Sequence, residues 1–189
     1  MAEDLPASQG AGPLLQRDYW AVLSDCTLKP SEVMTHVRSN FCALPPDALV
    51  SFDAPDGLAL NAVLDIVIRP SQRCAVRVIH ADAQSVTFAT QTGHPEAGRI
   101  TFGSYRNDNG DVIFHIRSRA RSATTLKRLG FLAIGDAMQT NTWSDFIRNT
   151  ATAVGARVRD VIHSHTTEAD ERPEDDEPLN APTFIATGD

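Results

Sequence analysis

Apolar residues recur with two different periods along the chain, and the change of period separates strands from helices. From about residue 48 to 120 apolar and polar side chains alternate, which is typical of strands that bury one face. The turns between these segments are short, and Asn109-Gly110 is a strong hairpin signal, so neighbouring strands should be antiparallel. The pattern predicts strands over residues 19–23, 48–53, 59–69, 74–80, 85–92, 99–105 and 112–120.

Two segments carry apolar residues three or four positions apart, as amphipathic helices do. The first opens at Pro30 and ends at Pro45-Pro46, and the second runs from about residue 125 to 165, with a break expected near residues 130–135. A curved antiparallel sheet that buries one face against the long C-terminal α-helix is an α+β fold. An internal cavity is expected between sheet and helix wherever the facing side chains are small.

The length of 189 residues is enough for one domain with a substantial core. Residues 1–16 are rich in Gly, Ala, Pro and Ser and are predicted to be a disordered lead. The folded domain is expected over residues 17–166, and residues 167–189 are predicted to be a disordered acidic tail.

The net charge of −7 comes from the C-terminal tail. Eight of the 24 acidic residues, but only one of the 17 basic residues, lie in 168–189, so sixteen of each remain in 1–167. A neutral body gives no long-range attraction for phosphate backbones, and nucleic acid is therefore not an expected partner.

Several further sites and locations are not expected. No apolar run approaches the ~18 residues needed to span a bilayer, so membrane insertion is not predicted. The polar, acidic N-terminus lacks the features of a secretory signal, which makes the cytoplasm the expected location. The three cysteines lie far apart and no nucleotide-binding glycine motif is present, so neither a metal nor a cofactor is predicted. The oligomeric state stays open, a homodimer being one option.

The loop after residue 92 carries the main candidates for acid–base chemistry. His94 can exchange a proton near neutral pH, and Glu96 can orient or charge it. The alternative is a structural turn, shaped by Gly93 and Gly98, whose side chains bond the backbone. His80 is a second candidate acid or base, or else a surface histidine at the end of its strand.

The alternation also predicts which side chains face the helix and any cavity. A few polar groups in an apolar wall are typical of small-molecule sites, although threonines also favour sheets for structural reasons. Arg117, Arg119 and Arg121 fall on the opposite face and are expected to be solvated. The predicted ligand-binding residues are Phe88, Thr90, Thr92, Phe102, Ser104, Phe114, Ser118 and Trp143, with Trp143 alternatively a core residue.

The segment Phe88-Ala-Thr-Gln-Thr-Gly-His-Pro-Glu-Ala-Gly98 resembles the Gly-His-Pro-Glu-x-Gly block of the DUF1990 family. This family belongs to the START and Bet v 1-like (SRPBCC) superfamily, and the similarity continues through residues 102–119 into the helix after Leu129-Gly130. It departs where Arg99 and Ile100 replace the acidic residues that usually follow the block. The resemblance implies a helix-grip fold, and the superfamily includes polyketide cyclases and lipid-transfer domains.

These observations favour a hydrophobic small-molecule-binding protein that acts as a cofactor-independent cyclase, isomerase or dehydratase (a lyase). The resemblance implies a polyketide-like or other natural-product intermediate as substrate, and a role in biosynthesis. One alternative is a non-catalytic lipid or metabolite carrier with the same cavity. Another is a partner-binding protein whose acidic tail is the functional element.

Overall fold

The computed structural model describes the backbone of residues 2–168 and their side chains apart from 125–137, 167 and 168. The elements along the chain are η1 (Ala7–Gln9), β1 (Ala11–Val22), α1 (Pro30–Asn40), η2 (Phe41–Ala43), β2 (Val50–Asp53), β3 (Val63–Ile68), β4 (Gln72–Ala81), β5 (Ser85–Thr90), β6 (Glu96–Arg106), β7 (Val112–Ser122), α2 (Thr125–Ala153) and β8 (Ile162–Glu168).

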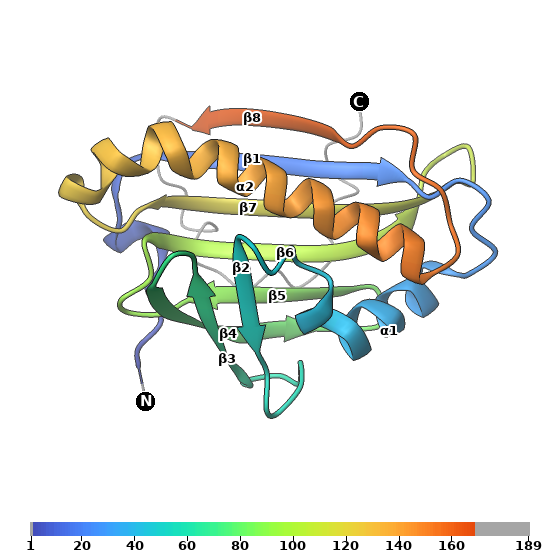
Figure 1. Ribbon diagram of the computed structural model, residues 1–189, viewed down its shortest axis with the longest axis horizontal. Helices are drawn as coiled ribbons and strands as arrows, with labels where there is room; N and C mark the ends of the chain where they lie inside the picture. Colours follow the sequence, from blue (N-terminus) through green and yellow to red (C-terminus); the bar gives the residue numbers. More distant parts are fainter. Residues whose placement is uncertain (1, 169–189) are drawn as a thin grey trace.

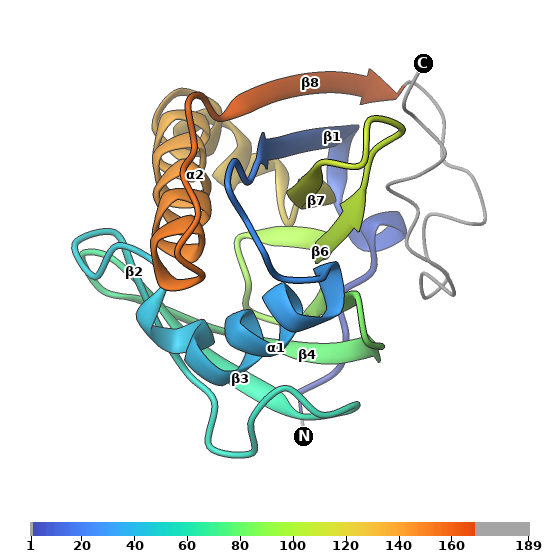
Figure 2. The same cartoon turned by 90° about the vertical axis from the view of Figure 1, so that its right-hand side faces the viewer.

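The strands form one antiparallel sheet in the order β2-β3-β4-β5-β6-β7-β1-β8. The six strands from β2 to β7 follow one another in space as in sequence, which confirms the predicted antiparallel run. The long helix α2 crosses the strands on one side of the sheet (Figure 1). Figure 2 shows the sheet curving from β8 round to β3 with α2 on its inner side, and the predicted helix-grip fold is confirmed.

The core lies between the inner face of the sheet and the two helices. Phe102 on β6 is 1% exposed, and its ring centroid lies 5.1 Å from those of both Phe41 and Phe146. Phe88 on β5 joins the same cluster, 5.7 Å from Phe102. Aromatic pairs at this separation add to the stabilisation that burial of their apolar area provides. This cluster fixes the height of α2 above the sheet.

Both ends of the domain differ from the sequence-based expectation. Residues 2–16 are not a disordered lead: η1 and the first half of β1 lie here, and Leu14 is fully buried. The second helix does not continue to residue 165 but ends at Ala153, followed by Gly155 at φ +69°, a left-handed conformation that glycine adopts without steric cost. It is unbroken at residues 130–135.

The segment after α2 turns back and pairs with β1 as β8, with His165 opposite Arg17. The predicted tail boundary at residue 167 therefore falls inside a strand, and residues 169–189 lie outside the described part of the chain. Helical spacing misled here because valines recur at steps of four on both sides of Gly155.

The outer face of β7 is more buried than its charged sequence predicts. His115 and Arg117 are 5% and 6% exposed, and both donate to Asp18 Oδ1 on β1, from Nε2 at 2.7 Å and Nε at 2.6 Å. The Tyr105 hydroxyl lies 3.2 Å from the other ring nitrogen of His115. The expectation of a fully solvated face was wrong at Arg117, because β1 brings a carboxylate to it from 99 residues away.

This network should make stability depend on pH through His115. Burial lowers the pKa of His115, and its bond to Asp18 opposes that shift without reversing it. The unfolded chain, with an ordinary histidine pKa of ~6.5, therefore takes up a proton before the folded protein does. The free energy of unfolding should fall as the pH drops below about 6.5, by at most ~1.4 kcal/mol per pH unit.

Urea denaturation of wild type and His115→Gln from about pH 8 to pH 5 measures this contribution. In His115→Gln the part of the fall in unfolding free energy that His115 causes should be absent. In His36→Gln, which changes an exposed position on α1, that fall should remain. Parallel pH profiles for wild type and His115→Gln would contradict a histidine that is held neutral by burial.

Candidate functional site

A pocket of about 120 Å³ lies between the inner face of the sheet and α2. Its size is of the order of the ~150 Å³ apolar cavity that holds a benzene molecule. Its polar wall residues are Thr90, His94, Glu96, Arg99, Ser118, Gln139 and Thr142. The apolar majority comprises Phe41, Leu49, Val50, Phe52, Ile66, Ile68, Val76, Phe88, Pro95, Ile100, Phe102, Ala120, Met138 and Trp143.

A buried ion pair lies at the end of the pocket formed by the β5–β6 loop. Glu96, at the start of β6, is 8% exposed, and its Oε1 lies 3.1 Å from Nη1 of Arg17, which is 3% exposed. Arg17 is on β1, so the pair spans β7, the strand between β6 and β1. Ala120 on β7 lies between the two positions in register, and its small side chain leaves room for this bridge. The pair places both signs of charge beside an apolar wall.

His94 is held by the backbone of Glu96. Its Nδ1 lies 3.0 Å from the backbone nitrogen of Glu96 and 3.0 Å from the backbone oxygen of the same residue. Nδ1 can therefore accept the amide hydrogen or, when protonated, donate to the carbonyl. Both tautomers of the neutral ring have a backbone partner, so Nε2 can act as a proton donor or a proton acceptor without movement of the ring.

Thr90 and Gly98 shape the base of this loop. The backbone nitrogen of Gly98 donates to Thr90 Oγ1 at 2.9 Å, and Oγ1 lies 3.0 Å from the carbonyl oxygen of Leu5. Gly98 has φ +151°, a region that other residues rarely occupy. The hydroxyl of Thr90 therefore serves the loop and the N-terminal segment, although the residue also lines the pocket.

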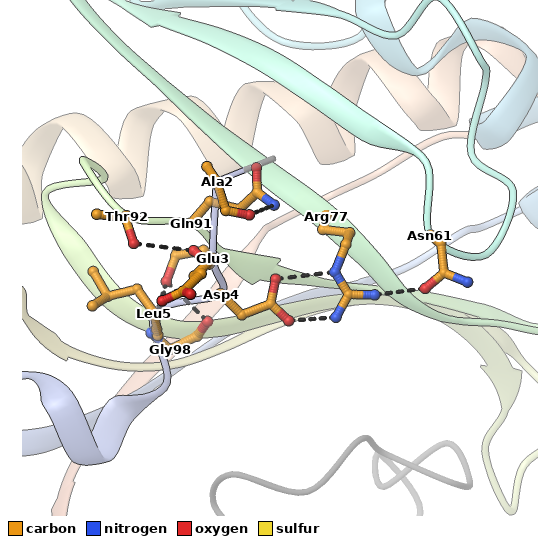
Figure 3. Close-up of polar contacts among 10 residues, drawn as sticks. Ala2, Glu3, Asp4, Leu5, Asn61, Arg77, Gln91, Thr92 and Gly98 are labelled. Atoms are coloured by element: carbon orange, nitrogen blue, oxygen red, sulfur yellow. Dashed lines mark hydrogen bonds and ion pairs between the residues drawn. The ribbon is translucent and has the colours of Figure 1, made fainter.

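The N-terminal segment, residues 2–5, forms hydrogen bonds with the same loop (Figure 3). The amide of Leu5 donates to the carbonyl of Thr90 at 2.7 Å, and the amide of Thr92 donates to the carbonyl of Glu3 at 2.9 Å. Asp4 receives both Nε, at 3.0 Å, and Nη2 of Arg77 on β4. The segment thus connects the loop that carries His94 to the body of the sheet.

The structure brings seven of the eleven predicted site residues to the pocket wall: Phe88, Thr90, His94, Glu96, Phe102, Ser118 and Trp143. Two others are buried elsewhere. Ser104 donates to the carbonyl of Ile113 at 2.8 Å, and Phe114 is a core residue that stacks on Phe146 at a centroid distance of 6.1 Å.

His80 and Thr92 point away from the pocket. A β-bulge between Val78 and His80 shifts the alternation, so His80 does not share the face of Val78. Its Nε2 lies 3.1 Å from Asp82 in the following turn. Thr92 is exposed because β5 ends at Thr90, and its hydroxyl donates to the carbonyl of Glu3.

Sequence reasoning missed Arg17 and the roof residues Gln139 and Thr142. The available signal was that Arg17 lies two and four residues before Tyr19 and Ala21 and therefore shares their face of β1. Tyr19 and Ala21 are buried on the inner face. Gln139 lies one helical turn before Trp143, which places both on one face of α2. A search for apolar residues at helical spacing does not select polar residues such as Gln139 and Thr142.

The described residues offer neither a metal site nor a membrane-spanning helix. No three His, Cys, Asp or Glu side chains gather closely enough there to hold a metal ion. In the same part of the chain, no helix combines the length and the apolar character needed to cross a bilayer.

Residues 44–149 match a family model described as a domain of unknown function (DUF1990). Two solved structures resemble the fold at low sequence identity. The di-domain ARO/CYC StfQ from the steffimycin biosynthetic pathway gives a TM-score of 0.53 at 6% identity, covering 79% of this chain and 52% of that one. Norcoclaurine synthase from Thalictrum flavum, in complex with dopamine and hydroxybenzaldehyde, gives 0.52 at 8% identity, covering 78% and 89%. No curated protein sequence matches the chain at a significant level.

Proposed function

The chain belongs to the DUF1990 family, and we propose that it encloses a hydrophobic small molecule under α2 and catalyses a cofactor-independent proton transfer on it. Cyclisation, isomerisation and dehydration are the reactions of this class, and a polyketide-like or other natural-product intermediate is the substrate. The observation that carries the proposal is the position of His94, whose ring can adopt either tautomer at the end of an apolar pocket.

The chemistry follows from these two tautomers. With Nδ1–H donating to the carbonyl of Glu96, Nε2 has a lone pair that can remove a proton from a carbon next to a substrate carbonyl. The electron pair of that C–H bond becomes an enolate. Return of the proton from Nε2 to a different carbon completes an isomerisation, and its transfer to a departing hydroxyl group releases water in a dehydration.

The other pocket residues support this step in different ways. Phe41, Phe88 and Phe102 form a rigid apolar wall that excludes water and holds the substrate in a reactive orientation, which raises the rate by proximity and orientation. The Arg17–Glu96 pair supplies fixed charges of both signs, and charges act more strongly beside apolar surfaces than in water.

A non-catalytic carrier of a lipid or metabolite is the second candidate. It is favoured by the bonds of His94 Nδ1 to the backbone of Glu96, because the same bonds close the loop as a structural turn. In a carrier, the pocket would bind its ligand by apolar burial alone.

Nitrobenzisoxazole distinguishes these candidates without knowledge of the natural substrate. A base in an apolar pocket removes its ring C–H proton, the electron pair forms a nitrile, and the N–O bond breaks to release a coloured phenolate. The wild-type protein should cleave this probe at least tenfold faster than His94→Gln, a modest share of the ~10²–10⁴-fold effect of a positioned base. His36→Gln, at an exposed position on α1, should match the wild type.

Binding of the probe without cleavage that depends on His94 would favour the carrier. If the wild-type protein neither binds nor cleaves the probe, the proposal of a small-molecule pocket is overturned as a whole.

A further inference from the structure

Three uncharged side chains of the pocket wall each carry a polar atom with no hydrogen-bond partner among the described residues: Ser118 Oγ, Gln139 Oε1 and Trp143 Nε1. All three are buried from solvent, and Ser118 as a whole residue is only 4% exposed. Buried polar groups in folded proteins nearly always have a partner, so each exception calls for an explanation. We propose that these three atoms bind a neutral aromatic ligand that carries both a carbonyl oxygen and a hydroxyl group.

The three side chains line one pocket from two elements, Gln139 and Trp143 from α2 and Ser118 from β7. Gln139 and Trp143 are four residues apart on α2 and therefore lie on the same face of the helix. The ring of Trp143 meets Phe102 of β6 edge to face, at a centroid distance of 5.5 Å and an angle of 78°. Ser118 of β7 pairs with Ile100, two residues before Phe102 on the same strand. The roof and the floor of the pocket thus each supply unsatisfied groups.

The chemistry of the three atoms defines what the ligand must contain. The indole N–H of Trp143 only donates, so it requires an acceptor such as a carbonyl oxygen. The carbonyl oxygen of the Gln139 side chain only accepts, so it requires a donor such as a hydroxyl group. The Ser118 hydroxyl can do either and can complete the hydrogen bonding of whichever group lies nearer.

Charge and shape narrow the class further. The charged side chains of the wall are confined to Arg99, His94 and the polar end with its Arg17–Glu96 pair, and the rest of the wall is mainly apolar. A charged ligand would lose its hydration without full compensation beside the apolar part. The rings of Phe41, Phe52 and Phe88 also line the pocket, and aromatic side chains pack well around a flat ring. A volume of about 120 Å³ suits a single substituted ring.

This inference rests on the proposed small-molecule pocket, and four probes separate the two ideas. Ethylbenzene tests apolar binding alone, acetophenone adds the acceptor, para-hydroxyacetophenone adds the donor, and para-acetylbenzoate adds a negative charge. Calorimetric titration of wild-type protein should show affinity rising by about fivefold with each added hydrogen-bonding group. The anion should bind at least about tenfold more weakly than para-hydroxyacetophenone.

Variants assign the gain to individual atoms. Trp143→Phe keeps an aromatic ring but removes the N–H, and should weaken acetophenone about fivefold more than it weakens ethylbenzene. Gln139→Met should reduce the advantage of para-hydroxyacetophenone over acetophenone. Trp20→Phe, which changes the other tryptophan of the chain outside the pocket, should leave the order of affinities intact.

Each result has a distinct meaning. If ethylbenzene binds as tightly as the oxygenated probes, or if the anion binds best, the ligand class is wrong although the pocket binds small molecules. If none of the four probes binds to the wild-type protein, the ligand class and the proposed pocket function both fail.

Discussion

Replacing Gly98 with alanine should lower the free energy of unfolding by about 3 kcal/mol or more, measured by urea denaturation. Gly98 has φ +151°, and a Cβ placed there would lie 2.2 Å from the carbonyl oxygen of Arg119 and 2.7 Å from Cα of Ala120. Both atoms belong to the backbone of β7. Neither can move away without disturbing the pairing of β6 with β7, so the clash cannot be relieved by a rotation of a side chain.

Gly93 provides the matched control for this prediction. It lies in the same loop at φ +101°, but a Cβ there would meet no atom within 4 Å. Gly93→Ala should therefore cost only the backbone strain, roughly 1 kcal/mol. Equal losses for Gly93→Ala and Gly98→Ala would show that conformation, and not the close approach of β7, accounts for the second glycine of the loop.

The fold could be predicted because the main signals are local. Alternation identified β2 to β7, and the short turns between them required antiparallel neighbours. Phe88 and Phe102 were placed at the cavity from strand alternation alone, and both lie in the pocket wall. Trp143, which was predicted as either a core residue or a wall residue, also lines the pocket. The family resemblance added the helix-grip arrangement, in which α2 lies on the inner side of the curved sheet (Figure 2).

The remaining features depend on contacts that are distant in sequence. Arg17 reaches Glu96 only because β1 lies beside β7, and β8 forms only because the chain turns back after Gly155. The misplacement of His80 has a different cause. One extra residue in a β-bulge reverses the alternation that assigns a face, and nothing in the local pattern marks it.

The two sides of β7 contribute to two different groups of interactions. Its inner side supplies Ser118 and Ala120 to the pocket, while its outer side supplies His115 and Arg117 to the network around Asp18. The outer network fixes β7 against β1, the strand that also carries Arg17. The polar end of the pocket therefore depends on interactions on the far side of the sheet.

The second large effect is expected at Asp18, where Asp18→Asn should lower the free energy of unfolding by about 3–5 kcal/mol. The variant keeps the shape of the side chain but removes the negative charge that faces Arg117, and one of its two polar atoms becomes a donor. Burial raises the pKa of Asp18, but the hydrogen bond from His115 and the charge and hydrogen bond of Arg117 together bring the pKa below its ordinary value. Asp18 therefore contributes stability above the unfolded-state pKa of ~3.9, and this contribution is lost as the pH falls through the folded-state value.

Asp25 separates the effect of burial from that of pairing. Asp25 also bonds an arginine, Arg157, but the two side chains are 59% and 81% exposed. Exposed pairs contribute little, so Asp25→Asn should cost less than about 1 kcal/mol in the same urea denaturation at pH 7. The difference between wild type and Asp18→Asn should also shrink as the pH falls below about 4, where Asp18 of the unfolded chain takes up a proton before Asp18 of the folded protein does. A loss at Asp18 no larger than that at Asp25 would mean that the outer network does not stabilise the pairing of β1 with β7.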